Sequence, residues 1–360
     1  MADLPPVRVV TAFDLPPVDS QAIYHAVAEC YVPGGPDTVI LARPASPYIC
    51  IGYHQDLDRE IDVAACERHG LPVYRRQVGG GAVYLDRNQV FLQWVFGPRH
   101  LPITLESRYQ LYAKPLIATY VSYGVPAVFR PVNDIHVGNR KIGGTGAATV
   151  GAAEVMVGSI LFNIDADAMA AALRVDSEKM RDKIAFSIKE YVTSLTRETG
   201  REIPQDEVVA TYLQHLDVAL GRTHYPGPLT AEEEHRLIQV RERFLQPGWT
   251  SNGGGRRVIG TKIHEGVSVL QGVYKAPGGL VRWILLVEDG TVVDATLEGD
   301  FTIAPGDAPA SLADLMVGRQ AEPTLLAQLV LAGFPGIVSS SPGLTAQDVI
   351  GALSRAFQPT

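Results

Sequence analysis

The chain has 360 residues, which is enough for about two domains with substantial hydrophobic cores. Its apolar fraction of 46% and its charged fraction of 19% exclude a disordered chain. The formal net charge of −8 argues against general nucleic-acid binding, which requires a basic surface, so we expect no nucleic-acid partner.

The cysteines and the apolar runs indicate the compartment. Cys30, Cys50 and Cys66 are odd in number and show no metal or redox spacing, so we expect buried, reduced thiols, which suit the cytoplasm. The N-terminal residues do not read as a signal peptide, and no apolar run reaches the roughly 20 residues of a membrane-spanning helix. We therefore expect a cytoplasmic monomer without a membrane partner.

The first two thirds of the chain alternate between strand and helix patterns. Residues 38–42 and 48–52 are expected to form a hairpin, and residues 82–96 one long strand. A helix is predicted over 105–123, with a kink at Pro115. Further strands are expected at 7–11, 72–76, 128–129 and 155–162, and further helices after Ser20 and at 61–69, 167–173, 203–220 and 230–244.

Two segments between these elements differ in character. Residues 135–137 and 140–142 predict a tight hairpin, because Gly138-Asn139 suits its turn. Residues 176–189 are charged without a clean period, which predicts a mobile loop.

The composition changes after Gln246-Pro247-Gly248, which marks a domain boundary. Strands are predicted at 265–274, 281–288 and 291–298, and Asp289-Gly290 between the last two is a strong hairpin signal. Helices follow at 310–316, 322–332 and 345–357. We expect one domain over 1–247 and a small α+β domain over 250–360.

Two glycine-rich stretches contain most of the chemically informative residues. In the first, Arg75 and Arg76 precede Gly79-Gly80-Gly81 and an apolar segment. Glycines let a ligand approach the backbone and leave amides for an anion, and arginines add forked donors. The second stretch, residues 133–146, holds a carboxylate, a lysine and another glycine cluster. A lone glycine triplet is more often a flexible turn, but the second stretch favours a ligand site.

Together the stretches resemble the lipoate-protein ligase A family of the biotin/lipoate ligase superfamily. The family pattern is Arg-Arg-x-Ser-Gly-Gly-Gly-Ala-Val-x-His-Asp, then Asn-Asp-aliphatic and Gly-x-Lys-aliphatic-Ser-Gly. This chain reads Arg-Arg-Gln-Val-Gly-Gly-Gly-Ala-Val-Tyr-Leu-Asp, then Asn-Asp-Ile and Asn-Arg-Lys-Ile-Gly-Gly. The resemblance implies an α/β (α+β) fold of the class II biotin/lipoate ligase type, with a mixed or antiparallel central sheet flanked by helices, and a C-terminal accessory domain.

The resemblance also implies an activity. An ATP-dependent, AMP-forming lipoate-protein ligase activates lipoate or octanoate to the acyl-adenylate with ATP and Mg²⁺, with lipoyl-AMP as the intermediate. It then transfers the acyl group to a lysine of a lipoyl-domain acceptor. The acceptor would be a 2-oxoacid dehydrogenase E2, the glycine cleavage H protein or a dedicated lipoate-binding protein.

By the same resemblance, Lys141 is the catalytic residue, because it matches the family lysine that grips the acyl carbonyl and the α-phosphate. Asp134 matches a Mg²⁺ ligand, since a hard carboxylate holds this cation against phosphate oxygens. The other residues expected to bind ATP or the acyl group are Arg76, Val78, Gly79, Gly80, Gly81, Ala82, Val83, Gln89, Asn133, Ile135, Gly143 and Gly144, with Asn88 as an alternative to Gln89. The segment 176–189 lies where the family has a lid over the adenylate, and the histidines, His136 among them, show no metal-ligand spacing.

The chain departs from the family pattern at several positions. Tyr53 stands where relatives have arginine, Val78 replaces a serine or threonine, and Leu85 replaces a histidine. Met156-Val157-Gly158 stands where many relatives have His-His-Gly. The substitutions at Val78, Leu85 and Met156-Val157 exchange hydrogen-bonding groups for apolar ones. They predict a more apolar acyl pocket, together with an altered substrate length, a specialised acceptor or a divergent ligase.

Three other functions share this fold. An octanoyl or lipoyl transferase acting between carrier proteins needs a cysteine nucleophile, and Val128 stands about where one such family has it. A non-catalytic lipoate- or adenylate-binding homologue would have lost the chemistry, which the retained Arg76, Asn133, Asp134 and Lys141 argue against. A biotin ligase matches the glycine and lysine motifs less closely.

Overall fold

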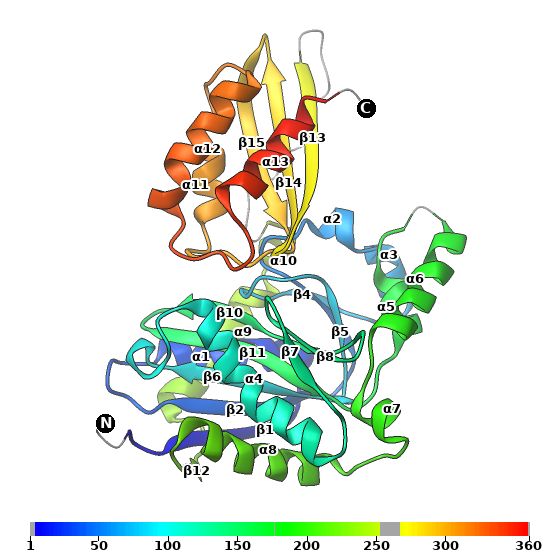
Figure 1. Cartoon of the computed structure of the whole chain (residues 1–360), viewed down its shortest axis with the longest axis vertical. Coiled ribbons are helices and arrows are strands. Elements are labelled where there is room, and N and C mark those ends of the chain that lie inside the picture. The colour runs from blue at the N-terminus through cyan, green and yellow to red at the C-terminus, as the bar shows by residue number, and fades with distance from the viewer. Residues whose placement is uncertain (1–3, 176, 253–266, 359–360) are drawn as a thin grey trace. The chain divides into compact units, whose positions relative to one another are not determined.

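The computed structural model describes residues 4–175, 177–252 and 267–358 (Figure 1). The chain forms two compact units. Unit 1 comprises Met1–Cys50, Asp58–Tyr74 and Val83–Gln246. Unit 2 comprises Ile51–Leu57, Arg75–Ala82 and Pro247–Thr360. The two short internal segments 51–57 and 75–82 therefore group with the C-terminal residues. A division of the chain at residue 247 alone would place them in the other unit.

A six-stranded mixed sheet forms the centre of unit 1. Strand β1 is parallel to β2 and β12, and the remaining neighbours are antiparallel. The buried, apolar β6 lies between β11 and β2, as expected of a central strand. In spatial order the strands are β10 (Gly146–Val150), β11 (Ala153–Leu161), β6 (Gln89–Phe96), β2 (Thr38–Pro44), β1 (Val7–Leu15) and β12 (His224–Pro226).

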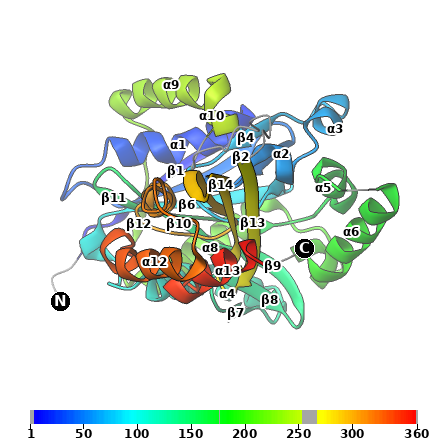
Figure 2. The same ribbon diagram turned by 90° about the horizontal axis from the view of Figure 1, so that it is seen from above.

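Helices cover both faces of this sheet (Figure 2). On one face α1 (Pro17–Glu29) packs against α9 (Ala231–Leu245), and on the other α4 (Leu105–Ser122) packs against α8 (Gln205–Leu220). The main core lies between the sheet and the α4–α8 pair, where Trp94, Tyr112 and Tyr212 are fully buried. Pro115 lies within α4, as predicted.

Two small sheets complete the strands of unit 1 and its borders. One has the order β4 (Val73–Arg75), β3 (Tyr48–Ile51) and β5 (Val83–Leu85), and the other β7 (Val128–Arg130), β8 (Asp134–Val137) and β9 (Arg140–Gly144). The expected 38–52 hairpin is wrong, because β2 and β3 lie in different sheets. The single strand 82–96 is wrong too, because the Asp86 carboxylate accepts hydrogen bonds from the Asn88 backbone and side chain and turns the chain between β5 and β6.

The expected loop over 176–189 is a helix, α6 (Glu178–Tyr191); residue 176 itself lies outside the described part. Ser177 caps the helix by accepting a hydrogen bond from the Met180 amide. Its half-buried side chains recur at helical spacing (Arg181, Ile184, Ala185 and Ile188), and this face packs against α5 (Ala166–Ala172). The short helices are α2 (Leu57–Glu60), α3 (Val63–Arg68) and α7 (Leu195–Thr199), with a 3₁₀ turn at Pro98–His100.

The C-terminal part of unit 2 is the expected small α+β fold. Its antiparallel sheet has the order β13 (Val267–Ala276), β14 (Gly279–Glu288) and β15 (Thr291–Gly299); residues 265 and 266 lie outside the described part. Asp289 and Gly290 both have positive φ, 48° and 76°, as the predicted tight hairpin requires. The helices in the described residues from 247 onward are α10 (Pro247–Asn252), α11 (Ala308–Asp314), α12 (Pro323–Ile337) and α13 (Ala346–Ala356). None of the helices in the described ranges is long and apolar enough to cross a membrane.

Candidate active site

The β8–β9 hairpin of unit 1 brings Asp134 and Lys141 together. Its turn is at Gly138, which has a φ of +57°, and a register shift follows Ile135. The Lys141 ammonium lies 2.7 Å from Asp134 Oδ1, and both side chains are partly exposed, at 35% and 25%. The hairpin therefore holds a solvent-accessible amine beside a carboxylate.

The two predicted glycines of β9 face opposite ways. A Cβ on Gly144 would lie 3.0 Å from Lys141 Cε and Nζ and 3.3 Å from Asp134 Oδ1. A Cβ on Gly143 would instead contact Ile135 and Leu116 on the core side. Gly144 thus leaves room for the ion pair, whereas Gly143 and the buried Ile135 belong to the packing beneath it.

Asn133 is fixed by its own backbone and side chain. Its Nδ2 donates to the Thr145 carbonyl at 2.5 Å, and its carbonyl accepts from the Thr145 amide at 2.9 Å. This double contact ties the start of β8 to the end of β9. Asn133, which directly precedes Asp134 in the chain, is therefore held in place by Thr145.

The structure adds neighbours that are not among the site residues expected from the sequence. His136, only 1% exposed, is paired with Lys141 across the strands, and its ring lies edge-on to Tyr191 at 5.8 Å between centroids. Burial, and then Arg130, lower the pKa of His136, while Asp134 opposes the shift. The Thr193 amide donates to the Lys141 carbonyl at 2.8 Å, so the chain after α6 runs beside β9. Alternation along β8 could have placed His136 on the face of Asp134, but nothing in the sequence points to Tyr191 or Thr193.

The glycine triplet belongs to unit 2, where Arg76 shapes it. The buried Arg76 guanidinium donates to the carbonyls of Gly79 at 3.0 Å and Gly81 at 2.8 Å. Gly80 has a φ of +98°, which favours glycine. A Cβ on Gly52 would meet the Gly80 carbonyl oxygen at 1.8 Å, so the two backbones are in close contact.

Arg75 ties the glycine triplet to the segment 51–57. Its guanidinium donates to the carbonyls of Gly52, Tyr53 and Gln55 at 2.6–3.0 Å. The buried Val78 accepts a hydrogen bond from the Tyr53 amide at 3.1 Å. The Tyr53 backbone therefore has a structural role at the position where relatives have arginine.

Three predicted residues lie at or beyond the end of the glycine motif. The half-buried Ala82 is the last residue of its unit 2 segment, and Val83 begins β5, where it pairs with Cys50. Gln89 begins β6 and donates from its side chain to the Tyr84 carbonyl at 3.0 Å. Its alternative, Asn88, lines a polar pocket of about 340 Å³ in unit 1 with Asp86 and other side chains.

None of the three cysteines forms a disulfide in the described part of the chain, and all three are poorly suited to act as nucleophiles. Cys50 and Cys66 are buried, and Cys30 is partly so. Burial raises the pKa of the Cys30 thiol, and raises that of Cys66 to about 11. Since the thiolate is the nucleophilic form, these two thiols are largely unreactive at neutral pH.

A family model described as the lipoyl protein ligase A/B catalytic domain matches residues 16–217. The chain belongs to this family. Relatives include a transferase and a ligase: octanoyltransferase LipM of Kyrpidia tusciae is 26% identical over 262 residues, covering 66% of this chain and 93% of that protein. Lipoate-protein ligase LplJ of Bacillus subtilis is 25% identical over 284 residues, covering 79% and 82%. The protein is therefore an enzyme of the lipoate ligase and octanoyltransferase family.

Solved structures of lipoate ligases share the fold. A bi-partite lipoate protein ligase from Thermoplasma acidophilum, described with its E2 lipoyl domain, matches with a TM-score of 0.64 at 23% identity, covering 71% of this chain and all of that one. A lipoate-protein ligase A bound with ATP matches with a TM-score of 0.59 at 21% identity, covering 69% and 99%. These matches confirm the expected mixed-sheet lipoate ligase fold.

Proposed function

We propose that the protein is an ATP-dependent lipoate-protein ligase. In the first half-reaction, the carboxylate of lipoate or octanoate attacks the α-phosphorus of ATP, which gives acyl-AMP and pyrophosphate. In the second, the amine of an acceptor lysine attacks the acyl carbonyl and releases AMP. The acceptor would be a lipoyl domain or a dedicated lipoate-binding protein, as the lipoyl domain of the Thermoplasma system suggests.

Lys141 would provide the positive charge that this chemistry requires. Two anions repel each other during adenylation, so a cation near the α-phosphate and the carboxylate lowers the barrier. The ammonium, partly exposed and held by Asp134, is poised for this role and would later polarise the acyl carbonyl for aminolysis.

Asp134 fits a magnesium ion that arrives with ATP. Mg²⁺ commonly takes one or two carboxylates and completes its shell with substrate phosphates and water. Among the described residues no group of three His, Cys, Asp or Glu side chains could hold a metal ion. A single carboxylate therefore suits a phosphate-bound Mg²⁺, which would neutralise phosphate charge, better than a resident metal.

The observation that carries the choice of ligase over transferase is the state of the cysteines. A transferase that forms a thioester needs an accessible thiolate, whereas burial raises the pKa of Cys30 and Cys66 and fully encloses Cys50. Val128, where one transferase family has its nucleophile, is 56% exposed and cannot form a thioester. Ligation through an adenylate needs no thiol.

Lipoate-dependent exchange of pyrophosphate into ATP tests the proposal. The wild-type protein should catalyse the exchange, and Lys141→Ala should lower its rate at least about 100-fold, because the charge beside the α-phosphate is lost. Lys114→Ala, on the exposed side of α4, is the matched control and should keep the wild-type rate. Absence of exchange together with acyl transfer from an octanoyl carrier protein would favour the transferase instead.

A further inference from the structure

His136 is a buried imidazole whose Nε2 has no hydrogen-bond partner among the described residues. Buried polar atoms in folded proteins nearly always have a partner, so an exception needs an explanation. Asp134 Oδ2 lies 3.7 Å from this nitrogen. The other oxygen of the same carboxylate is the one that faces Lys141.

The tautomer of His136 follows from its other nitrogen. Nδ1 lies 3.3 Å from Arg130 Nη1. A guanidinium can only donate, so Nδ1 must accept, and an imidazole that accepts at Nδ1 is neutral and has its proton on Nε2. The unpartnered atom is therefore an N–H donor beside a carboxylate.

The register of the small sheet explains why these groups meet. Arg130 of β7 is opposite Asp134 of β8, and His136 is opposite Lys141 of β9. Because residues two apart in a strand share a face, Asp134 and His136 lie on the same side. Tyr191, at the end of α6, adds an aromatic edge against the imidazole. The imidazole thus lies among an arginine, an aspartate, a lysine and a tyrosine.

We propose that His136 is a positioning residue whose Nε2–H holds Asp134 Oδ2 during catalysis. This inference rests on the proposed function. When Lys141 turns from Asp134 to the acyl carbonyl and the α-phosphate, the carboxylate loses the ammonium that holds Oδ1, and an N–H donor at Oδ2 would preserve its orientation. A shift of well under 1 Å brings the 3.7 Å contact into hydrogen-bond range, and catalytic contacts of this kind commonly tighten only when substrate binds.

Two substitutions separate a donor from a space-filling side chain. His136→Leu removes the donor and should lower kcat for lipoate-dependent exchange about tenfold. His136→Gln retains an N–H at nearly the same reach and should restore the rate to within about threefold of wild type. Val137→Ala, on the core-facing side of the same strand, tests general loss of stability in β8 and should leave kcat unchanged. A His136→Leu protein with wild-type kcat, or a His136→Gln protein as slow as His136→Leu, would overturn the proposal.

A double-mutant cycle tests whether His136 acts through Asp134. In an Asp134→Asn background, adding His136→Leu should cause little further loss, because the acceptor charge is already gone. An additional tenfold loss in that background would show that His136 acts by another route, and the proposal would fail.

The nitrogen-15 chemical shifts of the His136 ring provide a readout that does not depend on activity. The resonances that disappear in His136→Gln should report the neutral Nε2–H tautomer in the wild-type protein, and the Nε2 shift should change in Asp134→Asn. An Nδ1–H tautomer would contradict the inference. A wild-type protein without lipoate-dependent exchange would refute the proposed function. The nitrogen-15 shifts would still show whether His136 Nε2–H contacts Asp134, because they do not depend on activity.

Discussion

His25 lies wholly inside unit 1, in α1 against α9. Its ring packs between Tyr24 and Phe244, with centroids at 4.3 and 5.2 Å, and neither ring nitrogen has a hydrogen-bond partner among the described residues. Burial, and then the charge of Arg243, lower the pKa of His25 from 6.5 to about 3. The fold therefore accepts only the neutral imidazole.

The stability of unit 1 should consequently depend on pH through His25. The unfolded chain takes up a proton near pH 6.5 and the folded chain only near pH 3, so this contribution is complete above pH 6.5 and is lost as the pH falls toward 3. Between pH 7.5 and pH 5 the loss should be about 2 kcal/mol of unfolding free energy. Urea unfolding at the two pH values measures it.

Two histidine variants complete this experiment. His25→Phe keeps an aromatic ring and should abolish the loss attributed to His25. His235→Gln, at an exposed position of α9, should leave the loss intact. If the unfolding free energy depended equally on pH in the wild type and in His25→Phe, the loss could not be attributed to His25.

At the scale of single residues, the sequence motifs predicted part of the candidate site. The proximity of Asp134 and Lys141 follows from the Gly138-Asn139 hairpin, whose turn and pairing are local. The contribution of Tyr191 could not be predicted, because it depends on how a helix about 50 residues further along packs against β8 and β9. Local signals fix a hairpin, whereas tertiary packing decides what covers it.

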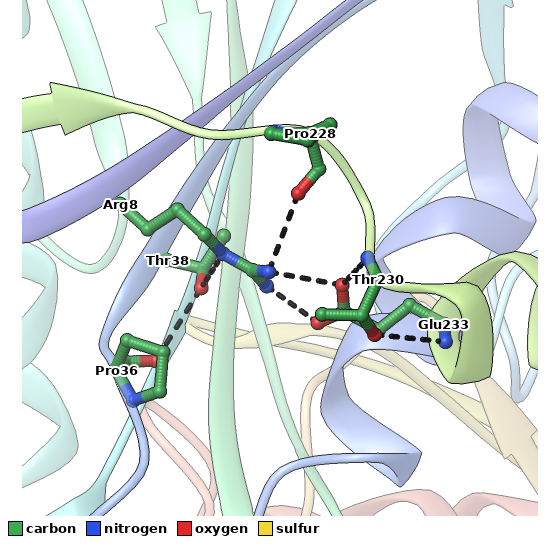
Figure 3. Close-up of polar contacts among 6 residues, drawn as sticks. All are labelled: Arg8, Pro36, Thr38, Pro228, Thr230 and Glu233. Atoms are coloured by element: carbon green, nitrogen blue, oxygen red, sulfur yellow. Dashed lines mark hydrogen bonds and ion pairs between the residues drawn. The ribbon is translucent and has the colours of Figure 1, made fainter.

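Helix α9 is anchored to the rest of unit 1 by ion pairs. Arg8 of β1 and Glu233 of α9, both 8% exposed, form a two-pronged pair at 2.5 and 3.0 Å, and Arg8 also donates to Thr38 (Figure 3). Glu233 closes a capping box with Thr230 at the start of the helix. Along α9, Arg241 pairs with Asp19 and Arg243 with Glu29, each at 2.5 Å. These contacts position a strongly charged helix that has few apolar residues to bury.

Removing one partner of the buried pair should therefore be costly. Arg8→Met leaves Glu233 without its cation and should lower the unfolding free energy by about 3–5 kcal/mol. Adding Glu233→Gln, which keeps a capping side chain, should recover most of that loss. Urea unfolding, monitored by a spectroscopic signal from unit 1, measures both changes.

An exposed pair provides the comparison. Arg87 pairs with Asp14, and the two side chains are 62% and 51% exposed, so Arg87→Gln should change the unfolding free energy by less than about 1 kcal/mol. A similar effect of Arg8→Met and Arg87→Gln would mean that burial does not strengthen the Arg8 contact.

At the scale of elements, most helices and the C-terminal hairpin were predictable, because caps, period and turn residues are local signals. The strand 82–96 was not, because its interruption depends on side-chain hydrogen bonds from Asp86. The pairing of 38–42 with 48–52 failed because a strand's partner is set by distant chain: β2 pairs with β1 and β6. Helix α6 was missed because its inner face is only half buried, which weakens the apolar period.

Unit 2 gathers residues from three distant parts of the chain. A Cβ on Gly79 would meet the Phe301 carbonyl oxygen at 2.5 Å, and the His54 ring stacks on Phe301 at 5.3 Å. The Gly299 amide donates to the His54 carbonyl at 3.0 Å. These contacts span more than 200 residues, so composition and spacing could not reveal that 51–57 and 75–82 pack with the C-terminal fold.

A chain truncated after Gln246 tests whether residues 75–82 depend on the C-terminal fold for their structure. Unit 1 keeps its own core and should fold, whereas amides in residues 75–82 should exchange with solvent at least about tenfold faster than in the full chain. Amides of β6 are the internal reference and should retain their protection. Hydrogen exchange read by mass spectrometry measures both, and unchanged protection in 75–82 would refute the shared packing.

The enclosure of Cys30, Cys50 and Cys66 bears on how the molecule withstands oxidants. Hydrogen peroxide attacks thiolates, and oxidation to sulfenic acid is the first step of that damage. A chain whose cysteine thiols are buried or half-buried, and whose proposed chemistry rests on an amine and a carboxylate, offers peroxide little thiolate to attack. Oxidative stress that silences thiol-dependent acyl transfer would leave such an enzyme working.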